Sequence, residues 1–248
     1  MNVVLVARNE AALKTLASEL EAEHGVSTRC VAADLSDPSP AVWARLRAAV
    51  EGLEVGVLVN NAGTAPRLAA HLEDQDLAFE RAMMEINCMA PLQMARMVLP
   101  GMKTRRRGLI VSIGSGMGSM PFAPMQVAYG SSKRFVEHAM RSLNAELLNT
   151  GVRAQCMIPM TVDTAMMKDS HAICPPAYMP TAATWVASAM RFMGHEPVCV
   201  PYWRHQYWRD GTLLLPEDLV LPKILEAQID SRRETLEVMK RQKAAKTE

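Results

Sequence analysis

Three short apolar runs, at residues 3–7, 28–33 and 55–59, alternate with two amphipathic segments at the start of the chain. The runs are rich in β-branched residues and end at polar ones, as buried parallel strands do. The segments between them carry apolar residues at helical spacing, and Gly25 follows the first segment where a left-handed cap would lie. Because such alternation produces right-handed crossovers, the sequence predicts an α/β fold with a doubly wound parallel sheet.

The composition limits the classes of function. A chain of 248 residues with 49% hydrophobic content can bury the core of one domain, which we expect to span residues 1–248. The formal net charge of +1 gives no electrostatic case for a nucleic-acid partner. Five scattered cysteines indicate reduced thiols. No run approaches the roughly 18 apolar residues of a membrane span, and no signal peptide is visible, so we expect a soluble chain.

A tyrosine and a lysine, Tyr129 and Lys133, open a long amphipathic segment that runs to Gly151. Residues four apart on a helix share a face, so the phenol and the ammonium group can meet at one point. A nearby cation favours the phenolate, and we therefore expect Lys133 to lower the pKa of Tyr129. A phenol of this kind can exchange a proton with a reacting oxygen.

Small and amide residues follow the third predicted strand, from Asn60 to Gly63. In doubly wound sheets ligands bind beyond the carboxyl ends of the strands, and glycine allows the backbone to approach a flat ligand closely. An ordinary strand-to-helix turn is the alternative.

Asn87 lies among apolar residues in a predicted helix at 75–103. A buried amide there needs partners, so it is either a core hydrogen-bonding group or a placed functional group.

A glycine-rich stretch, Gly114 to Ser119, follows a fourth predicted strand at residues 109–113. Its Gly-x-Gly-x-Gly pattern suggests a dinucleotide fingerprint, but Pro121 and Pro124 intervene before the Tyr129 helix, so we reject that interpretation. We expect instead a loop that places Ser115 opposite Tyr129. Further strands are predicted at 152–158 and 198–202, and further helices at 181–193 and 222–243.

The ordered set of Asn60 to Gly63, Asn87, Ser115, Tyr129-x-x-x-Lys133, and Pro159 with Thr164 resembles the short-chain dehydrogenase/reductase family over essentially the whole chain. The stretches at residues 55–61, 99–102 and 159–164 resemble one branch, which holds very-long-chain 3-oxoacyl-CoA reductases and 17-beta-hydroxysteroid dehydrogenases. The resemblance implies a Rossmann-like oxidoreductase that uses NADP(H) to reduce a carbonyl on a lipid-like substrate. The alternatives are a steroid or retinol dehydrogenase and a cofactor-poor remnant that binds or dimerises.

The same resemblance implies four catalytic roles. Tyr129 is the general acid, and Lys133 keeps it acidic and binds the nicotinamide ribose. Ser115 polarises the substrate carbonyl. Asn87 holds a water that links Lys133 to solvent.

The resemblance also implies a set of cofactor contacts. Arg8 follows the first strand, where a cation suits the 2′-phosphate of NADP; an exposed helix-start residue is the alternative. The other residues expected to contact the cofactor are Asp34 at the adenine, Thr164 at the carboxamide, and Asn61, Ala62, Gly63, Pro159, Tyr129 and Lys133. No metal site is expected, because His171-x-x-Cys174 has no second ligand pair.

Two departures from the family pattern stand out. Ser115 precedes Tyr129 by fourteen positions where the family has thirteen, so we expect a one-residue bulge, with Ser112 and Ser119 as fallback candidates. The family also begins with a strand and a glycine-rich turn that cradles the pyrophosphate. Residues 3–7 match its second strand, so we expect a sheet without its first strand, with unpaired edges facing each other. Either the chain is a fragment of an intact enzyme, which we favour, or a shortened form with impaired cofactor binding.

Partners and location follow from the resemblance as well. We expect a homodimer through the two long helices, and peripheral membrane association through residues 202–209, where aromatics mix with cations; covering an apolar pocket is the favoured alternative for that segment. Residues 165–215 are expected to form a pocket lid, and residues 216–248 a helix with a basic tail. The family points to the endoplasmic reticulum, or to the cytoplasm if an upstream anchor is absent.

Overall fold

A computed structural model describes residues 1–167 and 174–244. Its strands are β1 (Val3–Ala7), β2 (Thr28–Ala32), β3 (Val57–Asn60), β4 (Gly108–Ile113), β5 (Val152–Met157) and β6 (Val198–Cys199). Its α-helices are α1 (Glu10–His24), α2 (Pro40–Val50), α3 (Leu77–Met84), α4 (Ala90–Thr104), α5 (Gly116–Ser119), α6 (Val127–Glu146), α7 (Ala182–Phe192), α8 (Trp203–Leu213) and α9 (Glu217–Ala244). Within these residues, short 3-10 helices occur at Leu72–Asp74, Ala165–Met167 and Pro176–Tyr178, and a π-helical segment, η2, occurs at Glu85–Met89. The pattern is the expected α/β alternation.

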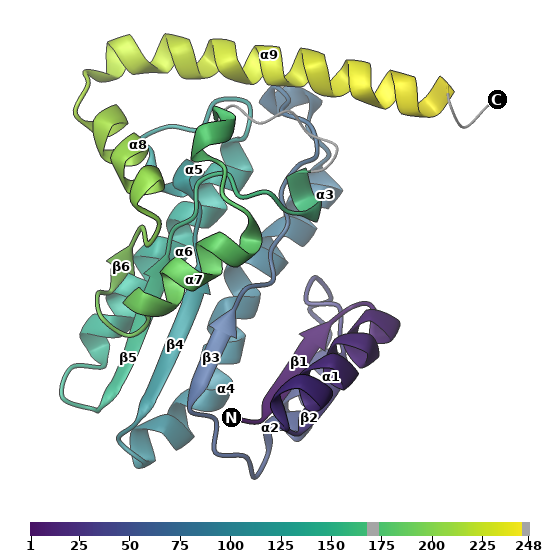
Figure 1. The fold of residues 1–248 in the computed structure, drawn as a ribbon, viewed down its shortest axis with the longest axis vertical. Helices are drawn as coiled ribbons and strands as arrows, with labels where there is room; N and C mark the ends of the chain where they lie inside the picture. Colours follow the sequence, from purple (N-terminus) through teal and green to yellow (C-terminus); the bar gives the residue numbers. More distant parts are fainter. Residues whose placement is uncertain (168–173, 245–248) are drawn as a thin grey trace.

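The strands form two separate parallel sheets. β1 pairs with β2, while β3, β4, β5 and β6 form a four-stranded sheet in that order. Within the described residues, no strand pairing joins the two sheets, and Figure 1 shows a gap between β1 and β3. The expectation of a sheet that lacks one central strand is therefore confirmed.

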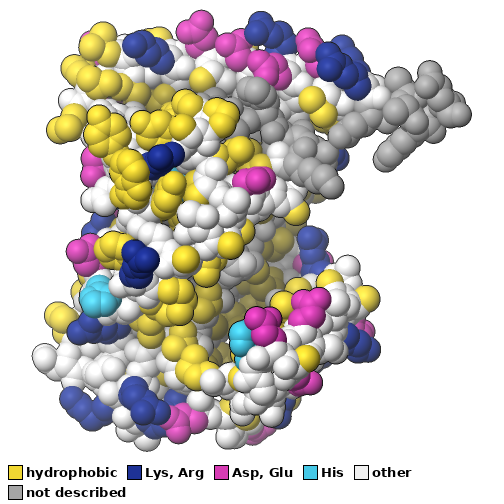
Figure 2. Space-filling model, viewed as in Figure 1, with side chains coloured by type: hydrophobic (Ala, Val, Ile, Leu, Met, Phe, Trp, Pro, Cys, Tyr) yellow, Lys and Arg dark blue, Asp and Glu magenta, His cyan; other side chains and the backbone are white. Residues whose placement is uncertain are grey.

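Helix α4 connects the two sheets by packing. Met94 packs both against the cluster around β1 and β2 and against the main core of β3 to β6. Because the sheets share this helix, burial of apolar surface holds them together where backbone hydrogen bonds do not. β3 is an edge strand of its sheet, and the side chain of its Val59 is 49% exposed. Figure 2 shows a hollow with hydrophobic side chains between the N-terminal part and the rest of the molecule.

The four-stranded sheet is covered on both faces. Ile110 of β4 packs with residues of α4 and α6, whereas its neighbour Val111 packs with Trp185 of α7 on the opposite face. Successive side chains on a strand point to opposite faces, so the consecutive apolar residues Leu109 to Val111 of β4 require burial on both sides. Because β3 to β6 are parallel, their carboxyl ends all lie at one edge of the sheet, near α5 and the start of α6 (Figure 1).

The helix predicted at 75–103 is present over residues 77–104, with a π-helical segment between α3 and α4. Two other predicted boundaries were wrong. The last strand ends at Cys199, since Pro201 has no N–H with which to continue a ladder. Helix α9 begins at Glu217, so Pro222 lies inside the helix and is not its first residue. Residues 168–173 of the expected lid and 245–248 of the expected tail lie outside the described residues.

Candidate active site

Helix α6 places Tyr129 and Lys133 one turn apart on one face. Tyr129 is half-buried, and burial raises the pKa of its phenol, while a hydrogen bond with the Ser115 hydroxyl lowers it by a smaller amount. The net shift of the Tyr129 pKa is upward from its ordinary value. The phenol is therefore protonated at neutral pH and can act as a proton donor.

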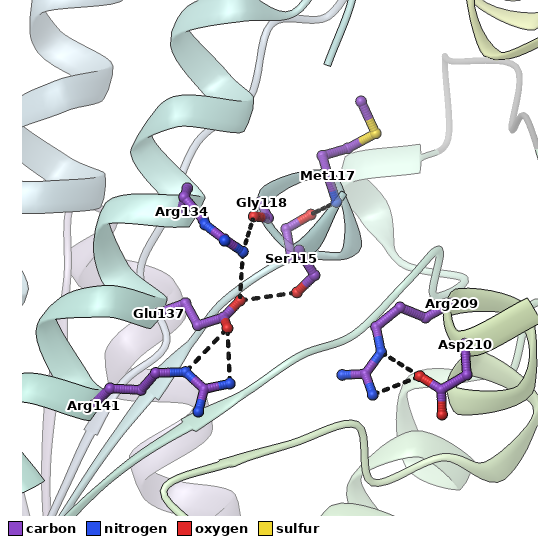
Figure 3. Close-up of polar contacts among 9 residues, drawn as sticks. Ser115, Met117, Gly118, Arg134, Glu137, Arg141, Arg209 and Asp210 are labelled. Carbon is purple, nitrogen blue, oxygen red and sulfur yellow. Dashed lines mark hydrogen bonds and ion pairs between the residues drawn. The ribbon is translucent and has the colours of Figure 1, made fainter. Parts of the chain in front are cut away.

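Ser115 is held at the start of α5. It is the N-cap residue of this single turn, and its hydroxyl oxygen accepts the backbone N–H of Met117 at 3.3 Å (Figure 3). The expectation of a non-helical loop was wrong, because one turn of helix does open on Gly116. Of the two fallback serines, Ser112 is fully buried and accepts from Asn60, and the Ser119 hydroxyl donates to Glu137. Of the three serines, Ser115 is the one whose hydroxyl bonds Tyr129.

The ammonium group of Lys133 lies in the interior. Its Nζ donates to the carbonyl oxygen of Ile113 at 3.0 Å, and burial lowers its pKa. The expectation that Lys133 lowers the pKa of Tyr129 was wrong for this structure, because burial has the larger effect on the phenol and raises its pKa. Nothing shifts the phenol toward its charged form except the weaker bond with Ser115.

Asn87 connects three segments from within the π-helical turn. Its amide oxygen accepts the N–H of Thr64 at 2.9 Å, and its amide nitrogen donates to the Thr64 carbonyl at 2.9 Å and to the Ser132 hydroxyl at 3.0 Å. Both amide hydrogens are thus used, so the side chain fixes the loop after β3 to α6. A π-turn is uncommon and often marks a functional site.

Gly63 lies where these groups meet. A Cβ atom at this position would be 3.2 Å from Lys133 Nζ and 3.3 Å from Asn87 Oδ1, tighter than most real contacts. Glycine therefore allows the backbone after β3 to approach the lysine closely. Four distant parts of the chain, around Gly63, Asn87, Ser115 and Tyr129, converge at the carboxyl ends of β3 and β4.

Sequence reasoning missed the polar contacts that fix α5 on α6. Glu137 is buried, accepts from Ser119 at 3.0 Å, and forms two hydrogen bonds with Arg141, while Arg134 donates to the Gly118 carbonyl (Figure 3). The available signal was an acidic residue one turn beyond Lys133 on the same helix face. His205 was also missed, since nothing near it in the sequence predicts its burial.

The remaining residues predicted to contact the cofactor lie in two places, after β1 and β2 and after β3 and β5. Arg8 and Asp34 follow β1 and β2, and two hydrogen bonds from Ser36, helped by the Arg8 charge, lower the pKa of the Asp34 carboxyl. Asn61 and Ala62 are exposed beyond β3. Pro159 accepts the N–H of Gly116 through its carbonyl at 2.8 Å, and the exposed Thr164 follows it.

A dinucleotide therefore fits this chain at its two ends. Gly63 lets the backbone come close to the Lys133 amine, which can bond a nicotinamide ribose, and the Arg8 guanidinium follows β1 at the other end. Between these ends lies the gap between β1 and β3. Within the described residues, no glycine-rich turn at a helix N-terminus borders that gap to supply amide donors for a pyrophosphate.

The aromatic residues of the segment at 202–209 lie mostly on α8, and they differ in exposure. Trp203 and Tyr207 are 66% and 69% exposed, whereas Trp208 packs edge-on against Tyr178. Only part of this segment can cover a pocket. Among the described residues no helix is both long and apolar enough to cross a membrane, and no cluster of three or more potential metal ligands occurs. His171 lies outside the described residues.

The chain as a whole matches known proteins of one class. Residues 1–173 match the family described as short chain dehydrogenase. Together with the parallel sheet and the Tyr129–Ser115–Lys133 arrangement, this match shows that the chain belongs to the short-chain dehydrogenase family. A solved short-chain dehydrogenase from Sphingobium yanoikuyae, in complex with NADPH, superposes with a TM-score of 0.72 at 29% identity and covers 86% of this chain and 84% of its own.

Sequence similarity narrows the family to a branch. The chain is 36% identical over 208 residues to the very-long-chain 3-oxoacyl-CoA reductase of Anas platyrhynchos, covering 82% of this chain and 65% of that protein. It is 34% identical over 197 residues to the 17-beta-hydroxysteroid dehydrogenase type 3 of Danio rerio, covering 78% of this chain and 62% of that protein. The chain thus spans less than two thirds of the length of each of these two relatives, and the branch is the one that the sequence motifs indicated.

Proposed function

We propose that this protein reduces a carbonyl on a lipid-like substrate with NADPH, and that the substrate is a 3-oxoacyl-CoA. The observation that carries the proposal is the hydrogen bond between the hydroxyls of Ser115 and Tyr129, beside the buried amine of Lys133. Two hydroxyls that meet at one point can bind one carbonyl oxygen. The branch similarity to very-long-chain 3-oxoacyl-CoA reductases supports the substrate class.

The residues of this chain supply the proton and the orientation. When bound, the nicotinamide supplies the hydride. Tyr129, kept protonated by burial, donates its proton to the carbonyl oxygen, and the Ser115 hydroxyl orients and polarises that carbonyl. Lys133 lies at Gly63, where it can bond the ribose hydroxyls, and Asn87 fixes the loop that carries Gly63. The water relay from Asn87 to solvent stays part of the proposal.

The preference for NADPH rests on Arg8. Its guanidinium follows β1 at the end of the sheet where an adenine ribose would lie, and a guanidinium can bind a phosphate with two parallel hydrogen bonds. The contacts of Asp34 with adenine, of Thr164 with the carboxamide and of Pro159 with the cofactor belong to the same proposal.

A 17-beta-hydroxysteroid dehydrogenase is the second candidate, favoured by the similarity to the zebrafish type 3 protein. It would use the same residues on a ring ketone. The open gap between β1 and β3 favours a third outcome, a binding or dimerising protein with poor cofactor affinity.

We also propose a homodimer, a peripheral membrane contact and residence at the endoplasmic reticulum. Exposed apolar residues on the long helices, such as Met89 and Phe135, support pairing of two copies. The membrane contact is supported by Trp203, Tyr207 and the exposed leucines at the junction of α8 and α9, which are Leu213, Leu214 and Leu215. The resemblance to the reductase branch supports the location.

The proposed activity is tested by cofactor binding and turnover. Saturable NADPH binding, followed by nicotinamide fluorescence, separates an enzyme from a non-enzymatic binding protein. Turnover of 3-oxoacyl-CoA substrates of increasing chain length beside a 17-ketosteroid then separates the two activities. Tyr129→Phe should lower kcat by about 10² to 10⁴ with little change in NADPH binding. Tyr207→Phe, at an exposed tyrosine on α8, is the matched control and should leave both unchanged. Retained reductase activity in Tyr129→Phe would exclude the phenol as the acid.

A further inference from the structure

His205 of α8 is fully buried, and both its ring nitrogens bond backbone groups. Nδ1 accepts the N–H of Met160 at 3.1 Å, and Nε2 lies 2.9 Å from the Tyr178 carbonyl and 3.2 Å from the Thr161 carbonyl. Because Met160 supplies a donor and the carbonyls are acceptors, the ring is neutral with its hydrogen on Nε2. One side chain thus bonds two segments that are distant from it in the sequence.

One of these segments leads directly to the active site. Pro159 precedes Met160, and its carbonyl oxygen accepts the N–H of Gly116 at 2.8 Å. Gly116 follows Ser115, and a Cβ at this position would meet the flexible thioether of Met160. The contacts run from the His205 ring to residues 159–160, then to Gly116, and then to the serine that bonds Tyr129.

An apolar side chain would fill the same space without making these bonds. Burial of an imidazole costs free energy unless both nitrogens are paired, so its place here reflects the three backbone groups that it satisfies. Around it, Tyr202 packs edge-on at 4.9 Å between ring centroids. The ring is therefore restrained by packing as well as by its hydrogen bonds.

We infer that His205 is a positioning residue: it fixes residues 159–161 so that the Pro159 carbonyl holds Gly116 and keeps the Ser115 hydroxyl at Tyr129. The inference rests on the proposed function for its catalytic consequence, but not for the structural link. The acceptor Nδ1 influences the position of Ser115 through its bond with Met160. The donor Nε2 bonds the Tyr178 carbonyl and does not take part in this chain of contacts.

Two substitutions separate these two halves of the ring. In His205→Asn the amide oxygen can reach the position of Nδ1 and still accept from Met160. In His205→Gln the amide nitrogen can reach the position of Nε2 and donate to Tyr178, while the acceptor is lost. We expect the Met160 and Gly116 amides to exchange hydrogen at least tenfold faster in His205→Gln than in wild type, and close to the wild-type rate in His205→Asn. The kcat of His205→Gln should be at least tenfold lower than that of the wild type, with KM unchanged. The kcat of His205→Asn should be close to the wild-type value.

The inference is overturned if Met160 exchanges faster in His205→Gln while Gly116 and kcat stay at wild-type values, or if both variants behave alike. Should His205→Gln fail to fold, the wild-type protein supplies the second measurement. Met160 and Gly116 should then show equal amide protection, because they open together, and protection that differs more than tenfold contradicts the link. A wild-type protein without reductase activity refutes the proposed function, while the exchange data still decide the role of His205.

Discussion

Gly118 is the position where a single methyl group tests the packing of the active-site turn. A Cβ there would lie 2.5 Å from the carbonyl carbon of Lys133 and 2.6 Å from the backbone nitrogen of Arg134. These are backbone atoms of α6, which cannot rotate away. To restore an ordinary contact of 3.4 Å, α5 would have to move away from α6 by about 0.9 Å.

The magnitude follows from two opposing effects. Overpacking of this kind costs about 1 to 3 kcal/mol, and alanine regains up to about 1 kcal/mol of helix propensity over glycine. Because the opposing atoms are rigid backbone, we take the upper cost and expect Gly118→Ala to lower the free energy of unfolding by about 2 kcal/mol. Because Ser115 caps the same turn, a displacement near 1 Å should also lower kcat by about 10².

The assay is urea unfolding followed by tryptophan fluorescence, with turnover measured on the same samples. Gly56→Ala is the matched control, since nothing lies within 4 Å of a Cβ at Gly56 and its stability should be unchanged or slightly higher. If Gly118→Ala is as stable and as active as Gly56→Ala, then α5 does not pack on α6 as described, and the glycine-rich stretch needs another explanation.

Three further predictions concern other parts of the site. Burial lowers the pKa of His205, so below about pH 6.5 the unfolded chain binds a proton that the folded chain does not. The free energy of unfolding therefore decreases as the pH is lowered, by up to about 1.4 kcal/mol per pH unit, and His205→Gln should lack this decrease. If the free energy of unfolding of the two proteins changes with pH in parallel, the assignment is wrong. Asn87→Ala removes the three hydrogen bonds of a buried side chain and should lower the free energy of unfolding in urea by about 2 to 3 kcal/mol. A loss below about 1 kcal/mol would show that the Thr64 loop is held by other contacts. Arg8→Ala should weaken NADPH binding about tenfold in a fluorescence titration and leave NADH binding unchanged, whereas equal weakening of both would exclude a role at the 2′-phosphate.

The fold could be predicted because its signals are local. Strands such as β1 and β4 are short, mostly apolar runs rich in β-branched residues, and α1 is followed by Gly25 in the left-handed conformation that the sequence indicated. The π-helical turn at Asn87 could not be predicted, since apolar residues continue on both sides of it at helical spacing. The position of α9 was misjudged because Pro222 was taken as its first residue.

The site could be predicted in part, and chiefly through the family resemblance. Tyr129 and Lys133 share a helix, so their spacing alone brought them together. The bond between Ser115 and Tyr129 depends on a turn whose packing is set by Gly118 and Glu137. His205 bonds backbone groups 27 to 45 positions away, and backbone groups leave no trace in a sequence. Such partners become visible only in three dimensions.

The gap in the sheet and the convergence of the catalytic side chains lie in different parts of the molecule. Tyr129 and Lys133 lie on α6, which packs on the continuous sheet of β3 to β6, and Ser115 caps α5, which packs on α6. The gap separates that sheet from β1 and β2, which carry the residues expected at the adenosine end of the cofactor. The proposed proton transfer from Tyr129 therefore does not depend on strand pairing across the gap, whereas the proposed binding of a dinucleotide does. A shortage of NADPH affinity with intact Tyr129 geometry is accordingly the behaviour that this architecture predicts.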